Sequence, residues 1–283
     1  MANLLSANFL RLRKSVLFWG TMILMTAMGA GFALQRVWEQ VTYAEFNHIS
    51  YIDEVFFHYA LMISVVTAVF IPLFFGSEYS DGTIRNKLAV GHSRASVYLA
   101  YAVTAAAVSI MFCAAYIAAV LIVGIPFING GIERPMPDFL LFLLGSLVMA
   151  AAYSALFTLV TMSQSRKTVS AVICLLGTLA LMFGSFYLGA RLDEPEIYYD
   201  MAQDATGGYV KLEQINPRYP RGAERTAFQL LYDISPMGQS IQYYSNYAGE
   251  KAPHPGRMIV CALFVTTVCT ATGSALFRKK DLK

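Results

Sequence analysis

The side chains that could perform chemistry are few, and their spacing matches no catalytic or nucleotide-binding motif. Gly91-His92-Ser93-Arg94 loosely suggests a nucleophilic serine, but it lies in a charged loop with no acid or base partner nearby in the sequence. The chain has no Gly-x-x-x-x-Gly-Lys-Ser/Thr loop for ATP phosphates, no His-Glu-x-x-His motif, no paired-carboxylate motif and no Gly-x-Ser-x-Gly elbow. We therefore expect no catalytic site, no metal site and no cofactor bound by this chain.

The cysteine and ionisable residues within the apolar segments also match no disulfide, metal or proton-transfer site. All four cysteines lie inside apolar segments, which favours small buried hydrophobic residues over disulfides or metal ligands: Cys113, Cys174, Cys261 and Cys269. His58 is the one ionisable residue within those segments, near the end of the second. Pumps driven by ion gradients usually place several ionisable groups in the membrane. The sequence therefore argues against a proton-coupled carrier, and we interpret His58 as an interface residue.

The most informative polar segment is the loop 76–94, which lies between two strongly apolar stretches. Asp81 or Thr83 is a candidate cap for a short helix that runs through Leu88, and Gly91 is a candidate stop. The loop is too short for a domain of its own. We therefore predict one short helix between the second and third apolar stretches.

The predicted helix has an apolar ridge with basic flanks. Ile84 and Leu88 are four residues apart and share one face, whereas Arg85 and Lys87 point elsewhere. Such a surface suits a groove on a soluble partner. The alternative is an ordinary basic loop that only sets the orientation of the chain.

The composition of the chain indicates that these elements lie in a lipid membrane rather than in water. The chain has 283 residues, of which 57% are hydrophobic and 14% charged, whereas soluble domains carry about 25% charged residues. Its mean hydropathy is +0.51. A membrane-spanning helix needs about 20 mostly apolar residues. Six segments meet that length: 16–34, 55–75, 97–123, 139–162, 168–190 and 258–277.

The basic residues predict the orientation of these spans. The N-terminus, the second loop, the fourth loop and the tail contain twelve of the 21 Lys and Arg residues but only three of the 18 Asp and Glu residues. Short loops rich in Lys and Arg stay in the cytoplasm. We therefore predict that both termini are cytoplasmic. The chain shows no internal repeat or linker, which indicates a single transmembrane domain, 1–283.

Three further elements are predicted outside the spans or between them. Leu5, Phe9 and Leu12 recur at helical spacing near basic residues, which indicates an N-terminal helix in the cytoplasmic interface or, alternatively, a plain basic flank. The long segment 191–256 is rich in tyrosine and acids and is predicted to lie outside. Small residues spaced four apart, as in Gly29 and Ala33 or Ser185 and Gly189, favour close helix packing within the chain.

Within the outer segment, the pattern predicts two short helices. The run 226–233 carries Phe228, Leu231 and Tyr232 on one helical face. Pro236 then interrupts, and 238–247 forms the second candidate helix. These pieces could enter the membrane where protein surrounds them, or they could form a water-exposed cap.

The loop after the second span resembles that of the type-2 ABC-transporter permease family. The matching residues are Glu78-Tyr79, Gly82-Thr83-Ile84-Arg85-Asn86-Lys87-Leu88, Gly91-His92-Ser93-Arg94 and Tyr98-Leu99. The tail 277–282 and the run 234–239 resemble the family more weakly. The order of six spans, a polar loop after the second and a large outer segment before the sixth extends the resemblance over the whole chain. Many relatives have proline where Gly91-His92 stands.

The resemblance implies an all-α membrane protein that works with an ABC ATPase, which would bind ATP and Mg on its own chain. A coupling helix between spans two and three would contact this ATPase through Glu78, Gly82, Thr83, Ile84, Arg85, Lys87, Leu88 and Arg94. A second permease, identical or a paralogue, would complete the translocation path among membrane lipids. The outer segment would line or gate the exit, with Phe228, Leu231, Tyr232, Pro236 and Gly238 as candidates. No nucleic acid is expected.

The leading hypothesis is therefore the permease subunit of an ABC exporter in the bacterial cytoplasmic membrane. Its substrate would be amphipathic or lipophilic, such as an antimicrobial peptide, a drug or a lipid. One alternative is a non-transport scaffold or sensor that recruits a partner through the loop 76–94. An intramembrane enzyme is a third possibility, which the lack of polar catalytic groups in the spans argues against.

Overall fold

A computed structural model describes residues 1–46, 49–203, 209–245 and 254–280 of the chain. In these residues, six helices are long and apolar enough to cross a membrane. Their bounds are α2 Val16–Thr42, α4 Tyr59–Ser80, α6 Arg94–Phe127, α7 Met136–Ser163, α8 Lys167–Leu192 and α11 Pro255–Lys279. The short helix α3, Asp53–Phe56, extends the second span. The six predicted spans are thus confirmed as helices, and the chain belongs to the multi-pass membrane proteins.

Two spans are much longer than predicted. Helix α2 continues eight residues beyond the predicted end of the first span, and α6 contains 34 residues. At about 1.5 Å per residue these helices exceed a hydrocarbon core of about 30 Å. Their extensions hold each other, because Gln40 accepts a hydrogen bond from the backbone N–H of Asn129 at 3.0 Å. Hydropathy predicts only the apolar part of α2, whose last eight residues include Arg36, Glu39 and Gln40, so the predicted span ended too early.

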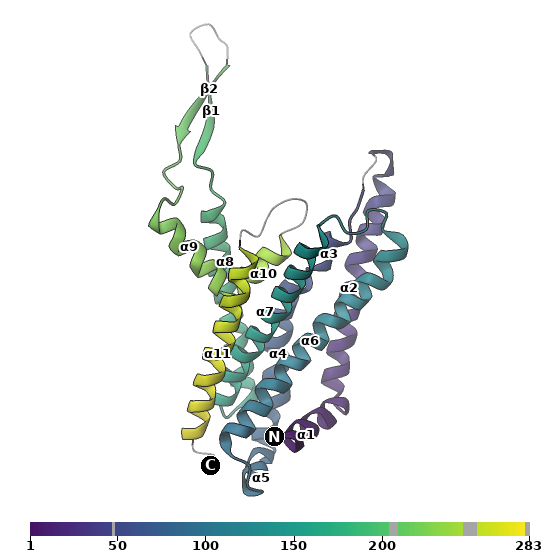
Figure 1. Ribbon diagram of the computed structural model, residues 1–283, viewed down its shortest axis with the longest axis vertical. Helices are drawn as coiled ribbons and strands as arrows, with labels where there is room; N and C mark the ends of the chain where they lie inside the picture. Colours follow the sequence, from purple (N-terminus) through teal and green to yellow (C-terminus); the bar gives the residue numbers. More distant parts are fainter. Residues whose placement is uncertain (47–48, 204–208, 246–253, 281–283) are drawn as a thin grey trace.

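The long helices form two rows (Figure 1). One row contains α2, α4 and α8, and the other contains α6, α7 and α11. Helices α4, α6 and α7 are the most enclosed, while α2, α8 and α11 expose most of their surface. Gly29 packs on the backbone of Tyr116, where no side chain would fit, so this part of the small-residue pattern serves packing within the chain. All four cysteines are buried and form no disulfide.

Short elements occupy the two ends of the bundle. Helices α1, Ala2–Arg13, and α5, Thr83–Ala89, lie at the end that also holds both chain termini (Figure 1). The opposite end carries a 3-10 turn, Ala44–Phe46, and helices α9, Ala223–Ile234, and α10, Pro236–Tyr244. The helices predicted for 226–233 and 238–247 are confirmed with shifted bounds, although residues 246 and 247 lie outside the described part. Pro236 separates the two helices as predicted, and it does so as the first residue of α10.

The outer segment also contains a β-hairpin that the sequence analysis did not anticipate. Strands β1, Ile197–Gln203, and β2, Tyr209–Ile215, pair antiparallel with Ile197 opposite Ile215. The prediction of an all-α protein is therefore corrected to a mostly helical one with a single two-stranded sheet in the described residues. Tyrosine and isoleucine in both segments, and valine in the second, favour strands.

Candidate functional site

Helix α5 begins and ends through glycine rather than through a polar cap. Gly82 occupies the N-cap position with φ +67°, and the helix has no side-chain cap, so neither Asp81 nor Thr83 caps it. The Thr83 hydroxyl instead donates to the carbonyl oxygen of Glu78 at 3.4 Å. Gly91 has φ +95° directly after the helix, as expected for a left-handed stop. A residue with a Cβ would strain both turns.

The apolar ridge of α5 faces its own bundle. Ile84 is buried, and Leu88 is half-buried against the hydrophobic core. The expectation that this ridge fits a groove on another protein is therefore not met, because the ridge is already occupied. Burial of Ile84 alone contributes about 2 kcal/mol to holding α5 on the bundle.

Glu78 is the centre of a cluster that joins four helices. Its carboxylate, only 2% exposed, forms ion pairs with Arg11 of α1 and with Lys87 of α5, whose Nζ lies 2.6 Å from Oε2. The hydroxyl of Tyr101, on α6, also donates to the carboxylate. Lys87 donates further to Asn8 at 3.1 Å and to Tyr101 at 2.9 Å. A buried carboxylate with two cations and a hydroxyl donor is well compensated, so the cluster fixes α1 and α5 to the spans.

Arg94 and Lys280 make a second connection at this end. The Arg94 guanidinium donates to the carbonyl oxygen of Lys280. The Lys280 ammonium donates to the carbonyl oxygens of Met162 at 3.0 Å and Gln164 at 2.8 Å, which closes the C-terminus of α7. Burial lowers the pKa of Lys280 to about 8. The last span is thereby tied to the start of α6 and the end of α7, while Asp281 and the residues after it lie outside the described part.

Several side chains of the loop 76–94 remain on the surface. Val90 is 79% exposed, although it is apolar. Four exposed side chains share the outer face of α5: Thr83, Arg85, Asn86 and Ala89. Asp81 before the helix and Ser93 after it are exposed as well.

The eight predicted site residues thus have three kinds of position. Gly82 forms the turn before α5, and Thr83 and Arg85 face outward. The other five contact the bundle or its C-terminal end: Glu78, Ile84, Lys87, Leu88 and Arg94. Sequence spacing could not separate these positions, because charged residues occur both among the anchored and among the outward-facing side chains.

The serine of the Gly91-His92-Ser93-Arg94 run has a structural task. Ser93 caps α6, since its hydroxyl oxygen accepts the backbone N–H of Ser96 at 3.2 Å. This contact accounts for the serine without any nucleophilic role.

At the opposite end, Asp233 organises a polar cluster that sequence reasoning missed. The carboxylate is fully buried and forms an ion pair with Arg257 of α11. It also accepts hydrogen bonds from Gln229 at 2.9 Å and Gln242 at 3.2 Å. Gln239 joins the backbones of Asp233 and Met258. The only signal in the sequence for a buried Asp233 was its position beside apolar residues on a short amphipathic helix.

The predicted gate residues pack closely around the turn between α9 and α10. Tyr232, Pro236 and Gly238 are buried, whereas Leu231 is 55% exposed, so the predicted common face with Tyr232 is not formed. Phe228 is half-buried. A Cβ on Gly238 would overlap the carbonyl oxygen of Tyr232, so this turn admits only glycine. The Ser185 and Ser235 hydroxyls, 3.1 Å apart, link this turn to α8.

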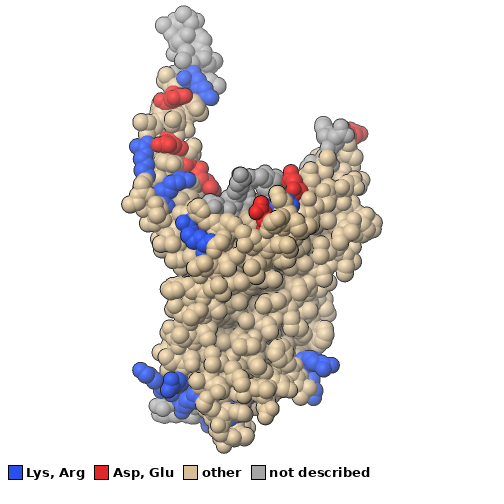
Figure 2. Space-filling model, in the orientation of Figure 1, with Lys and Arg blue, Asp and Glu red and all other residues tan. Residues whose placement is uncertain are grey.

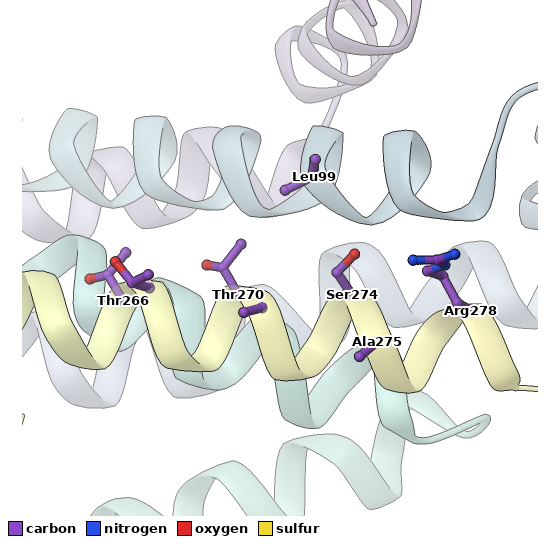
Figure 3. A pocket seen from close by; sticks show the side chains of 8 residues that line it. Leu99, Thr266, Thr270, Ser274, Ala275 and Arg278 are labelled. Carbon is purple, nitrogen blue, oxygen red and sulfur yellow. The ribbon is translucent and has the colours of Figure 1, made fainter.

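A groove of about 540 Å³ lies between α6 and α11. Figure 3 shows Thr266, Thr270, Ser274 and Arg278 along α11, with Leu99 on the facing helix. The Thr266 hydroxyl donates to the carbonyl oxygen of Ala262 in its own helix. The groove includes none of the predicted site residues.

Charge separates the two ends of the molecule. In the view of Figure 2, the end that bears α1 and α5 shows basic side chains but no acidic ones, whereas the opposite end shows both. The cytoplasmic loops of membrane proteins carry such an excess of Lys and Arg.

Comparison with known proteins places this arrangement in a family. The sequence model described as "ABC-2 family transporter protein" matches residues 4–181, from α1 through most of α8. No curated protein matches the chain. Because the match covers well over half of the sequence and the described residues form six candidate membrane spans, the chain belongs to the ABC-2 family of transporter permeases.

Proposed function

We propose that this permease is the membrane subunit of an ABC exporter and is driven by an ATPase on a separate chain. The exposed face of α5 would contact that ATPase, with Arg85 making a charge-assisted contact and Val90 entering an apolar depression. The supporting observation is the anchoring of α5 through Glu78. A helix that is fixed to three other helices, yet exposes one face, can pass a displacement to them.

The same cluster suggests how nucleotide binding would act on the spans. ATP and Mg would be held by the ATPase subunits, whose closure would displace α5. Because the Glu78 cluster links α5 to α1, α4 and α6, these helices would move together as one body. Arg94 and Lys280 would carry the displacement to α7 and α11. The permease chain itself would perform no ATP hydrolysis.

The proposed orientation puts both termini, α1 and α5 in the cytoplasm of a bacterial cell, and puts α9, α10 and the hairpin outside. The distribution of basic residues supports it. Helix α1 would lie in the cytoplasmic interface, because it is amphipathic and precedes the first span. The turn of α9 and α10 would form the outer gate of a single permease domain.

A second permease copy or a paralogue would complete the path. Gly20 and Gly31 on α2, and Gly177 and Gly184 on α8, each face open space where a Cβ would meet no other atom. These glycines would let another bundle approach the row of α2, α4 and α8 closely. The proposed substrate is amphipathic or lipophilic, as an antimicrobial peptide, drug or lipid is, in keeping with the apolar surfaces of the spans.

The test is co-purification followed by reconstitution. The tagged permease is extracted gently from its bacterium, and its partners are identified by mass spectrometry. We expect an ATPase with a phosphate-binding loop at about one copy per permease. Substitutions Arg85→Glu and Val90→Asp should lower its association and the ATP-dependent export. Arg13→Glu makes the same charge change as the first variant on the exposed surface of α1 and should have little effect.

A non-transport scaffold or sensor that uses the same face is the second candidate. It predicts a partner that co-purifies without ATP-dependent flux. If no ATPase is recovered even after crosslinking from position 85, the exporter proposal is wrong and the scaffold becomes the better explanation.

A further inference from the structure

The β-hairpin projects from the bundle with both faces uncovered. Figure 1 shows it extending beyond α8 and α9 at the end opposite the termini. The side chains of Ile197, Tyr199 and Ile215 are exposed on one face, and those of Tyr198 and Leu212 are exposed on the other. Apolar side chains on both faces of a free sheet indicate a surface that another molecule covers.

The base of the hairpin is held firmly, so the surface has a defined position. The Asn216 side chain donates to Glu194 at 2.8 Å and to the carbonyl oxygen of Pro195 at 3.0 Å. Its backbone N–H donates to Glu196 at 3.0 Å. An ion pair of 3.6 Å between Arg191 and Glu224 joins the ends of α8 and α9 below it.

Both edges of this sheet are available for pairing. The sheet has two strands, so half of the backbone N–H and C=O groups on each strand point away from its neighbour. An isolated two-stranded hairpin is marginally stable in water, whereas a third strand adds a ladder of hydrogen bonds. Strand addition at a sheet edge is a common way to bind an extended peptide.

The charge of the hairpin indicates what kind of peptide fits. Its described residues, 193–203 and 209–215, contain five acids and one base: Asp193, Glu194, Glu196, Asp200, Glu213 and Lys211. The ammonium of Lys211 lies 3.6 Å from the centre of the Tyr199 ring. In the segment that follows the strands, the guanidinium of Arg225 lies over the Tyr219 ring, while Arg218 and Arg221 are exposed. Such a surface attracts cations and offers tyrosine rings to them.

We infer that the hairpin binds an extended cationic peptide by strand addition along one of its edges. Backbone pairing would supply affinity, and Glu196 and Glu213 would select basic side chains. This inference rests on the proposed function, which puts the hairpin outside the cell and includes peptides among the substrates. It adds a first binding surface outside the spans.

The test uses the full-length permease in nanodiscs of zwitterionic lipid and a fluorescent ten-residue peptide of alternating Lys and Val. A matched peptide of alternating Glu and Val controls for charge. A third peptide, Lys-Val with alternate backbone nitrogens methylated, keeps the charge but cannot complete the ladder. Binding is measured by fluorescence anisotropy against empty nanodiscs. We expect binding of the first peptide, and at least about tenfold weaker binding of the other two.

Variants then locate the site. Glu196→Gln with Glu213→Gln should weaken binding of the Lys-Val peptide about fourfold, since each exposed charge contributes modestly. Glu45→Gln with Glu133→Gln removes the same charge elsewhere at this end and should leave binding unchanged. Peptide binding should also slow hydrogen exchange of the strand amides.

Equal binding of the three peptides, or no loss in the hairpin variant, would overturn the inference. Crosslinking between cysteines at position 213 of two permeases, undisturbed by peptide, would show that a second copy covers the hairpin and would overturn it as well. None of these measurements involves the ATPase, so their failure leaves the exporter proposal standing. Conversely, peptide binding without a co-purifying ATPase would refute only the exporter.

Discussion

The ammonium group of Lys87 lies 2.6 Å from the buried carboxylate of Glu78, although the two residues stand at opposite ends of a polar loop. This pair turns one side of α5 toward the bundle. It leaves Arg85 and Val90 on the other side. Helix α5 therefore has one face anchored to the bundle and one face exposed.

Glu78→Gln should lower stability more than Lys87→Met. Removing the carboxylate charge leaves two cations facing each other, which costs about 3 kcal/mol for a buried pair. Lys87→Met retains the ion pair with Arg11 and should cost about 1 kcal/mol. Thermal unfolding in detergent, combined with the double variant, measures the coupling energy of the pair. Additive effects of the two substitutions would contradict the direct pairing.

Gly238→Ala should loosen the turn between α9 and α10. The new methyl group would overlap the carbonyl oxygen of Tyr232, and overpacking against backbone costs about 1–3 kcal/mol. Unfolding temperature and protease sensitivity of the outer segment report the change. Gly256→Ala is the matched control, because its Cβ would meet open space at the start of α11. A Gly238→Ala protein as stable as this control would show that the turn has room.

Asp233→Asn should disconnect α9 and α10 from the last span. The substitution leaves Arg257 without its anion and removes an acceptor from Gln229 or Gln242, so we expect a loss of about 3 kcal/mol. Hydrogen exchange should rise in α10 before it rises in α4. Asp138→Asn, at an exposed position on α7 at the same end, serves as the control. Unchanged exchange in α10 would speak against a locking role.

Lys280 should react with acylating reagents at lower pH in the folded protein than in the unfolded one. Its pKa of about 8 lies below the ordinary value of about 10.4, so about a quarter of the amine is neutral and nucleophilic at pH 7.5. Peptide mapping after brief acylation should give a titration midpoint near pH 8. In the denaturant-unfolded protein the same lysine should recover its ordinary pKa of about 10.4. The same pH profile for Lys280 in both states would contradict the effect of burial.

The sequence allowed the spans to be predicted, because lipid imposes a length and an apolar composition on each of them. It also indicated the short helices α1, α5, α9 and α10 through residue periodicity. The end of α2 was missed, since its extension carries polar residues such as Arg36 and Gln40 and obeys no lipid constraint. The end of α6 was placed too early at Val123, before Gly124 and Pro126, although the helix continues through both to Phe127. The hairpin was missed because its strands, IYYDMAQ and YVKLEQI, mix apolar and polar residues without a clear alternation.

The six spans and the predicted cytoplasmic ends thus followed from local patterns of hydropathy and charge, and the family from the resemblance of the loop after the second span. These patterns did not show which charged residues are buried. Glu78, Lys87 and Arg85 are alike in polarity and lie within one short loop, and only the approach of α1 and α6 decides that the first two face inward. Asp233 likewise gains its partner from α11, 24 residues away. A buried charge is stable only beside its counter-charge, and bringing distant segments together is a property of the tertiary structure alone.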